Sequence, residues 1–139
     1  WTEHGPNNVA GRTRAIMFDP NDATNKKVWA GGVYGGLWYT TDITATSPTW
    51  TKVDDFWDNM AVSCIASDPN TPNTFYVGTG EAYTQASLGY GIWKTINGGE
   101  RWDRLTTTNF DYIKINIQKN IKKTFILRNI DIKFIIYLS

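Results

Sequence analysis

The chain carries the same series of short motifs twice, and this duplication restricts its fold more than any other feature. RAIMFDP at 14–20 is matched by SCIASDP at 63–69, and VWAGG at 28–32 is matched by FYVGTG at 75–80. Further along each copy, GGLWYTTD is matched by YGIWKTIN, and a tryptophan closes each unit (Trp50, Trp102). A motif series that recurs over roughly 50 residues indicates one supersecondary unit laid down twice.

Each unit contains four short strand patterns separated by turn residues. The first ends at Asp-Pro-Asn, because proline cannot donate to a strand ladder and this tripeptide suits a turn. The other three are Lys27 to Gly31, Leu37 to Thr40 and Trp50 to Val53, with their counterparts in the second copy. Four antiparallel strands in such a unit are typical of a β-propeller blade.

The predicted fold is therefore all-β: an incomplete β-propeller of about two four-stranded antiparallel blades, led by an N-terminal strand. The first repeat covers about 11–53 and the second about 60–105. Because propellers close with ~4–8 blades, we expect the chain to be a fragment that leaves apolar blade faces uncovered.

Composition excludes several classes of function. The net charge is +1 and only 19% of residues are charged, so no basic surface for nucleic acid is expected. One histidine, His4, and one cysteine, Cys64, exclude a disulfide framework and any site built on several of these ligands. No apolar run reaches the length of a membrane-spanning helix. We expect no metal and no cofactor.

The last part of the chain, 106–139, differs sharply from the rest. It carries six Lys or Arg against two Asp or Glu, a net of +4, whereas 1–105 carries eight against eleven, a net of −3. Nine isoleucines lie in 109–139, and no glycine, proline or tryptophan does. Since AT-rich DNA read in an unselected frame encodes such a composition, one interpretation is a frameshifted or truncated end. The other is a pair of ordinary strands, because Ile113, Ile115 and Ile117 alternate with polar residues and Phe134 to Leu138 is a continuous apolar run. No function is assigned to it.

The segment TINGGERW, Thr95 to Trp102, resembles an Asp-box, the turn found in BNR repeats. Thr95, Gly99 and Trp102 match that pattern, and Asn97 stands where the family has aspartate. The first copy matches more loosely, through Thr40, Asp42 and Trp50. In such a hairpin the Asx side chain accepts backbone N–H groups, glycine supplies positive φ, and tryptophan packs into the blade. The resemblance therefore implies a structural role for these residues.

Residues 1–105 as a whole resemble secreted bacterial propeller proteins with BNR or sortilin-like (VPS10-like) repeats. GPNNVAGRTRAIMFDPND, the Asp-Pro…aromatic-x-Gly pattern and GIWKT carry this resemblance. It implies a secreted or cell-surface bacterial protein that binds polysaccharide or an extracellular protein, assembled with the remaining blades of its parent chain.

The same pattern is similar to family 74 xyloglucanases, which implies a competing function. Those enzymes place a catalytic aspartate just before the Gly-Gly of the first blade, but here the run is AGGVYGGLW, with Val33 or Tyr34 in that neighbourhood. Sialidases, which share the Asp-box, need an arginine triad, and Arg12 and Arg14 alone do not make one. We therefore favour a non-catalytic scaffold. The alternative is part of a glycoside hydrolase whose catalytic carboxylates lie in other blades.

Strand parity predicts which end of the blades binds ligand. In a four-stranded meander the first and third turns share one end, while the second turn and the link between blades share the other. The second end collects aromatic and acidic residues on loops, where binding residues usually lie. Aromatic rings could stack on sugars while carboxylates accept hydroxyl hydrogen bonds. The candidate ligand-binding residues are Tyr34, Asp54, Asp55, Trp57, Asp58, Glu81 and Tyr83. The competing interpretation is that the aromatic residues pack between blades and the acidic residues are solvated turn residues.

Overall fold

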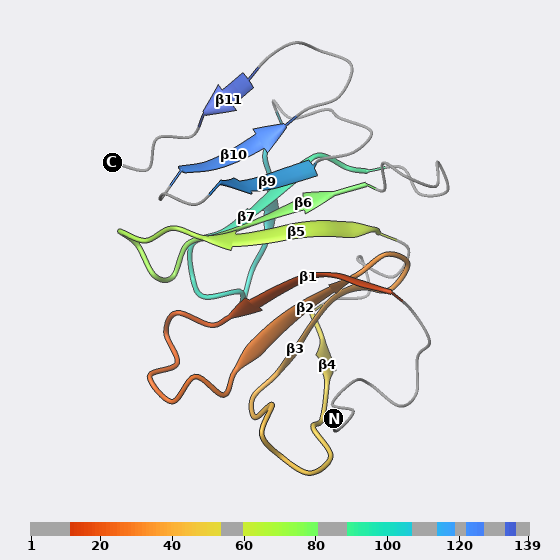
Figure 1. Cartoon of the computed structure of the whole chain (residues 1–139), viewed down its shortest axis with the longest axis vertical. Coiled ribbons are helices and arrows are strands. Elements are labelled where there is room, and N and C mark those ends of the chain that lie inside the picture. Colours follow the sequence, from red (N-terminus) through yellow and green to blue (C-terminus); the bar gives the residue numbers. More distant parts are fainter. Residues whose placement is uncertain are drawn as a thin grey trace.

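The computed structural model describes residues 12–53, 60–80 and 89–106, together with the backbone of three later strands. The first sheet consists of β1 (Thr13–Phe18), β2 (Val28–Gly32), β3 (Gly36–Thr40) and β4 (Thr51–Lys52). The second sheet consists of β5 (Val62–Ser67), β6 (Phe75–Thr79), β7 (Ile92–Thr95) and β8 (Asp103–Arg104). In each sheet the four strands pair antiparallel in chain order (Figure 1). The described residues contain no helix.

The two sheets repeat each other residue by residue. The row Ile16–Ala30–Trp38–Lys52 crosses the first sheet, and Ile65–Val77–Trp93–Arg104 crosses the second at the equivalent register. The pairing also shifts at the same place in both, between Thr13 and Ala15 and between Val62 and Cys64. A shared irregularity of this kind is a feature of the repeat itself, since bulges are specific structural devices.

The hydrophobic core lies between the two sheets. From the first sheet it takes Ala15, Trp29 and Leu37, and from the second it takes Val62, Phe75 and Val77, with Met60 beside them. Because β-strand side chains alternate between faces, each sheet contributes one face to this core. Gly31 allows the close approach, because a Cβ there would overlap Val62 Cγ1 and would lie 2.8 Å from Val62 Cβ.

A cluster of aromatic rings closes the core at one end. The Trp29 ring meets those of Phe75 and Trp102 edge-on, with centroids 5.8 and 6.2 Å apart. Tyr39 lies against the other side of Trp29, at 5.1 Å. Such tilted pairs stabilise a core by about 0.5–1.5 kcal/mol each beyond the burial of their surface. The tryptophans of both repeats thus hold the sheets together.

The chain after the repeats forms a third sheet of three antiparallel strands, in the order β11–β10–β9. They are β9 (Lys114–Gln118), β10 (Lys122–Ile126) and β11 (Lys133–Ile135). Strand β9 contacts β5, on the side of the second sheet that lies away from the first (Figure 1). The described backbone after residue 106 consists of these three strands. The expected strand before β1 falls in 1–11, outside the described residues.

Candidate functional site

The loops of the two sheets gather at two opposite ends. The turn end holds the β1–β2 and β3–β4 turns and their counterparts in the second sheet. There the Asn21 side chain donates to the Pro72 carbonyl, and Gly98 N–H donates to the Asn73 carbonyl. The loop end holds the β2–β3 turn and the segments around Ala61 and Gly91, where Gly36 N–H donates to Met60 and Gly80 N–H to Ala61. The Asn21–Pro72 and Gly36–Met60 hydrogen bonds thus join the two repeats, one at each end, while the other two lie within the second repeat.

Asp22 organises the β1–β2 turn at the turn end. Its carboxylate accepts the backbone N–H groups of Thr24, Lys26 and Lys27 at 2.7–2.9 Å, and also the Thr24 hydroxyl. The Thr24 hydroxyl is the largest cause that lowers the Asp22 pKa well below its ordinary value, followed by the backbone donors. Because these donors all belong to the turn itself, the Asp22 carboxylate stabilises the turn.

Asp19 is the buried carboxylate of the turn end. Its side chain is only 2% exposed and accepts the Trp29 indole N–H at 3.0 Å and the Lys27 ammonium at 2.9 Å. Lys27 Nζ also lies 5.0 Å from the Trp29 ring centroid. Burial by itself raises the Asp19 pKa, but the hydrogen bonds from Lys27, Asn21 N–H and Trp29 together lower it. The turn therefore fixes the Trp29 ring, the largest buried ring of the core.

Thr95 and Asn97 organise the β7–β8 hairpin. The Thr95 hydroxyl accepts the N–H groups of Asn97 and Gly99 and donates to Asn97 Oδ1, and that oxygen also accepts Arg101 N–H at 3.0 Å. Gly98 and Gly99 have φ of 71° and 93°, where a side chain is strained. The Trp102 indole donates to the Gly99 carbonyl at 3.1 Å. The hydrogen bonds of the Thr95 hydroxyl, the Asn97 side chain and the Trp102 indole therefore all stay within the hairpin.

The corresponding hairpin of the first sheet is built differently. Asp42 accepts Thr44 N–H at 2.8 Å, and its other oxygen lies 3.4 Å from Lys26 Nζ, so it bonds to the neighbouring β1–β2 turn. Thr40 is buried, and Trp50 is half-buried. The carboxylate thus links two turns of one sheet, whereas Asn97 spans its own turn.

A shallow pocket of about 330 Å³ opens at the turn end, lined by Asp19, Asn21, Asp22, Thr24, Lys27 and Thr41. Both of its carboxylates already accept several protein donors. Within the described ranges, no cluster of three His, Cys, Asp or Glu side chains could hold a metal ion. Cys64 is buried, and burial raises the pKa of its thiol to about 12, so it is protonated at neutral pH.

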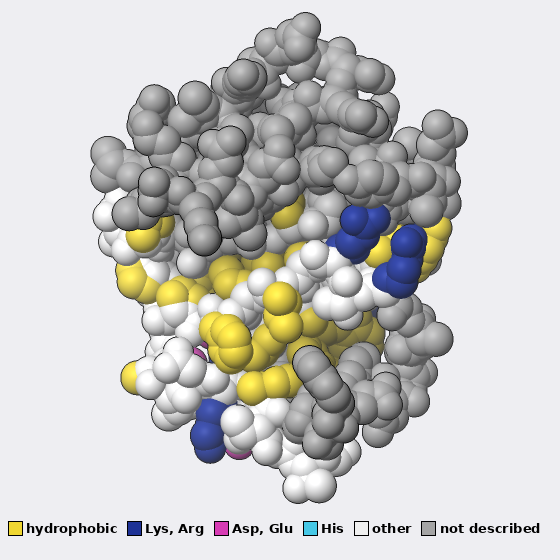
Figure 2. Space-filling view, in the orientation of Figure 1, with side chains coloured by type: hydrophobic (Ala, Val, Ile, Leu, Met, Phe, Trp, Pro, Cys, Tyr) yellow, Lys and Arg dark blue, Asp and Glu magenta, His cyan; other side chains and the backbone are white. Residues whose placement is uncertain are grey.

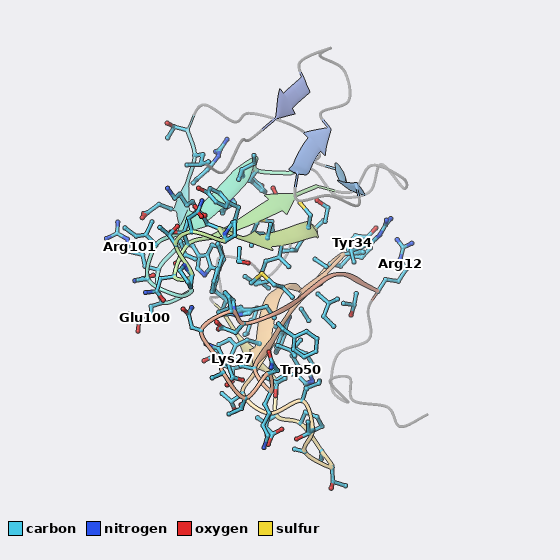
Figure 3. All side chains as sticks on the ribbon, turned by 60° about the vertical axis from the view of Figure 1, so that its left-hand side comes forward. Arg12, Lys27, Tyr34, Trp50, Glu100 and Arg101 are labelled. Carbon is cyan, nitrogen blue, oxygen red and sulfur yellow. The ribbon has the colours of Figure 1, made fainter. Side chains whose placement is uncertain are left out.

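The loop end carries Tyr34, whose side chain is 52% exposed. Three hydrogen bonds fix the turn beneath it: Val33 N–H to the Arg12 carbonyl, Gly36 N–H to the Met60 carbonyl, and the Trp38 indole to the Gly35 carbonyl at 2.6 Å. Figure 3 shows Arg12 and Tyr34 side by side at this end, and Lys27, Glu100 and Arg101 away from it. Tyr34 is therefore an aromatic side chain presented to solvent on a rigid turn.

The other six predicted ligand-binding residues, Asp54, Asp55, Trp57, Asp58, Glu81 and Tyr83, lie outside the described residues. Tyr90 was not among the residues predicted from the sequence, yet it is 55% exposed next to this end. Its N–H donates to the Thr79 hydroxyl, which donates to the Gly91 carbonyl. Strand parity places it at this end, because Tyr90 lies in the segment before β7, just as the β2–β3 turn lies before β3.

No family model and no curated protein matches the chain. Among solved structures it is similar to YCF48 from Cyanidioschyzon merolae, with a TM-score of 0.61 and 21% identity over 90% of this chain and 37% of that one. It is also similar to an ancestral GH74 enzyme, with a TM-score of 0.60 and 19% identity over 90% of this chain and 17% of the enzyme. The fold is an incomplete β-propeller. The expectation of an all-β propeller with four-stranded antiparallel blades is confirmed, and the first and second sheets are its two blades.

The chain thus spans well under half the length of either similar structure. At these identities the likeness extends to the fold alone. No helix in the described part of the chain is long and apolar enough to cross a membrane.

Proposed function

We propose that the chain is part of a secreted or cell-surface bacterial propeller scaffold that binds a glycan through its loop end and is not itself catalytic. One observation carries the proposal: Tyr34 is half-exposed on a turn fixed by hydrogen bonds to Arg12 and Met60. A rigid aromatic side chain supplies contact area with little loss of conformational entropy on binding. Its ring face suits a sugar ring, and its hydroxyl can exchange hydrogen bonds with sugar hydroxyls.

Arg12 adds a donor group beside that ring (Figure 3). A guanidinium presents five N–H donors and keeps its charge at any physiological pH. The candidate acidic and aromatic residues of 54–58 and 81–83 follow β4 and β6, whose ends lie at the loop end. This placement supports a binding surface that extends across both blades.

The proposal is tested by native affinity electrophoresis of the full chain in gels that contain xyloglucan, with Tyr34→Ala as the variant. We expect the polysaccharide to retard the wild type and the variant to bind about 5–10-fold more weakly, as loss of an aromatic contact implies. Ile96→Ala is the control, since Ile96 is 69% exposed at the turn end. Retardation that Tyr34→Ala leaves unchanged contradicts the proposed site, and no retardation of the wild type by any polysaccharide contradicts glycan binding.

The fold likeness to a GH74 enzyme favours one second candidate, part of a glycoside hydrolase. Hydrolysis needs a pair of carboxylates about 5–10 Å apart. Asp19, Asp22 and Asp42 are engaged by turn donors at the opposite end, so the pair would come from other residues. Release of reducing sugar from xyloglucan by the complete propeller would favour this function over the scaffold.

The hairpin 95–102 supports the relation to BNR repeats. We infer that it is of the Asp-box type, with the Asn97 amide oxygen in the place of a carboxylate oxygen. The Thr95 hydroxyl and the Arg101 N–H both donate to Asn97 Oδ1. A carboxylate oxygen would accept these two hydrogen bonds equally well. A sortilin-like receptor function would appear instead as peptide binding that added sugar does not compete with.

A further inference from the structure

The β7–β8 hairpin contains the only Asn-Gly pair in the sequence, Asn97–Gly98. Asparagine is a thermolabile residue, and it deamidates fastest before glycine, because glycine has no side chain to shield its backbone nitrogen. The Asn97 side chain is exposed to water, and Gly98 adopts a φ of 71°. The hairpin that brings Trp102 against the core therefore contains a chemically labile pair of residues.

Deamidation at this pair needs only water. The Gly98 backbone nitrogen loses its proton and attacks Asn97 Cγ, so that a bond forms between these two atoms. The bond from Cγ to the side-chain nitrogen breaks, and that nitrogen takes up a proton and leaves as ammonia. Water then adds to one of the two carbonyl carbons of the resulting succinimide, and the bond from that carbon to the ring nitrogen breaks. Hydrolysis at Cγ gives isoaspartate's alternative, aspartate, only if the backbone bond is kept: opening at the side-chain carbonyl gives aspartate, and opening at the Asn97 backbone carbonyl gives isoaspartate, in which the chain runs through Cβ and Cγ.

The folded hairpin opposes the loss of the Gly98 proton. Gly98 N–H donates to the Asn73 carbonyl at 2.9 Å, in the turn between β5 and β6 of the same blade. Without its proton the nitrogen would carry negative charge and would face the lone pairs of that carbonyl oxygen, which repel it. The fold therefore disfavours the form of Gly98 that attacks.

Hydrogen bonds also hold the group that is attacked. Asn97 Oδ1 accepts the Thr95 hydroxyl at 2.8 Å and Arg101 N–H at 3.0 Å, and the Thr95 hydroxyl accepts Gly99 N–H at 3.1 Å. Ring closure brings Cγ onto the Gly98 nitrogen, and these contacts restrict the rotations that it needs. The two donors to Oδ1 also polarise the amide, which by itself favours attack. Attack nevertheless requires the Gly98 proton to leave first, so the bond to Asn73 decides.

From this arrangement we propose that Asn97–Gly98 is a deamidation site that the folded hairpin keeps unreactive and that opening of the hairpin releases. The site lies at the turn end, next to the β5–β6 turn. It is therefore separate from the proposed glycan site around Tyr34 at the loop end, and neither depends on the other.

The two products differ in what they leave of the hairpin. Aspartate keeps a side-chain oxygen where Asn97 Oδ1 accepts its two hydrogen bonds. Isoaspartate inserts a further carbon into the backbone, which displaces Gly98 from the Asn73 carbonyl and Gly99 from the Trp29 ring that it covers. An opening that ends in isoaspartate is thus irreversible, because the chain no longer re-forms this hairpin.

Loss of the hairpin would uncover apolar surface. The Trp102 ring packs against those of Trp29 and Phe75, with centroids 6.2 and 6.5 Å apart. In Figure 2 a band of hydrophobic side chains already crosses the described part of the molecule at the level of β1 and β2. Because larger exposed apolar patches promote aggregation, the isoaspartate form should be less soluble than the aspartate form.

The first test compares the folded chain with an unstructured reference. The full chain and a synthetic peptide of residues 92–106 are held in the same mildly alkaline buffer, and mass spectrometry of proteolytic fragments follows the exchange of ammonia for water at Asn97. We expect Asn97 to react at least about tenfold more slowly in the chain than in the peptide, since its reaction requires opening. Urea should abolish this difference. Equal rates without urea, faster reaction in the folded chain, or a difference that persists in urea each overturn the proposal.

The second test asks whether the hairpin itself gives the protection. Thr95→Ala removes the hydroxyl that donates to Asn97 Oδ1, so in native buffer Asn97 should react about fivefold faster or more, as loss of a hydrogen bond implies. Thr95→Ser keeps the hydroxyl and should react like the wild type. Ile96→Ala should do the same, because the Ile96 side chain is 69% exposed.

Slow reaction of Cys64 with a thiol reagent shows that each variant is folded, since Cys64 is buried. A wild-type rate of deamidation in folded Thr95→Ala overturns the proposal. Where Thr95→Ala does not fold, the comparison of the wild-type chain with the peptide decides.

The third test separates the two products. Chain that has been deamidated in urea is returned to native buffer, and the ratio of isoaspartate to aspartate at residue 97 is measured in the soluble and the sedimented fractions. Isoaspartate should be enriched in the sediment, and aspartate in the soluble chain. The same ratio in both fractions overturns the proposed effect of isoaspartate on the hairpin.

Discussion

Gly99 of the second blade lies directly over the Trp29 indole of the first: a Cβ on Gly99 would overlap Trp29 Cη2 and would stand 2.7 Å from Trp29 Cζ2. The contact joins the β7–β8 hairpin to the largest buried ring of the core. Trp102 of the same hairpin packs edge-on against Trp29, and Asp19 accepts the indole N–H from the other side. The turn end of one blade thus completes the aromatic core of its neighbour.

Gly99→Ala should destabilise the chain by about 2 kcal/mol or more, because the methyl group overlaps Trp29 and the residue has a positive φ of 93°. Gly35→Ala is the control. Its nearest neighbour would be Trp38 Nε1 at 3.6 Å, an ordinary contact, so a change within about 0.5 kcal/mol is expected. Urea unfolding of both variants measures the difference. Equal stabilities of the two would show that the hairpin does not pack on Trp29.

Gly31→Ala tests the approach of the inner strands. The new Cβ would overlap Val62 Cγ1, so the variant should lose about 1–3 kcal/mol by overpacking. Val62→Ala removes the clashing methyl groups and leaves a cavity when made alone. The double variant Gly31→Ala/Val62→Ala should therefore be more stable than the sum of the two losses predicts. Simple additivity in chemical unfolding would contradict contact between the two residues.

Asn97→Ala and Asn97→Asp separate acceptor chemistry from side-chain identity. Alanine removes the oxygen that accepts Arg101 N–H and the Thr95 hydroxyl, which should cost about 1 kcal/mol. Aspartate keeps the acceptor, so its stability should stay within about 0.5 kcal/mol of wild type. Thermal unfolding of the two variants gives the comparison. Equal losses in both would mean that the amide N–H₂ group, rather than the oxygen, matters.

Stability should fall as the pH is lowered through the acid range. The folded-state pKa of Asp19 lies below its ordinary value, so its contribution is present above the unfolded pKa of about 3.9. That contribution is lost as the pH falls through the folded-state pKa. The pKa values of Asp22, Asp42 and Asp68 shift in the same direction and add to this acid sensitivity.

Asp19→Asn isolates the contribution of Asp19. The difference in unfolding free energy between wild type and variant should be largest above about pH 5 and should shrink toward pH 2. Asp103→Asn is the control, because the Arg101–Asp103 pair is exposed and is expected to contribute less than about 1 kcal/mol. A wild-type–variant difference that is independent of pH would show that the Asp19 carboxylate is not held in its ionised form.

Sequence patterning predicted the blades because their determinants are local. Proline after Asp19 and Asp68, alternation along the strands and the closing tryptophans each fix a strand or a turn, and their duplication fixes the repeat. The stacking of the two sheets depends on tertiary contacts that no single motif encodes. Gly31 shows this, since its role appears only when Val62 lies opposite.

The site was less accessible to sequence reasoning. Tyr34 could be placed at the loop end by strand parity, but the turn that presents it is fixed by Arg12 and Met60, which lie far from it in sequence. Asp42 matches the aspartate of the Asp-box pattern in the first repeat. However, its second carboxylate oxygen lies near Lys26, which belongs to another turn. A sequence motif within one hairpin does not predict a contact between that hairpin and a neighbouring turn, such as the Lys26–Asp42 ion pair.

The fold depends above all on the stacking of the two repeats as successive blades, with the inner strand of one against the other. A nuclear Overhauser experiment between the Val62 methyl protons and the Gly31 α-protons in the full chain observes this stacking without any substitution. Stacked blades should give a strong cross-peak, together with the cross-strand peaks of both sheets. Cross-strand peaks in each sheet with no Val62–Gly31 peak would mean that the blades form without stacking in this way.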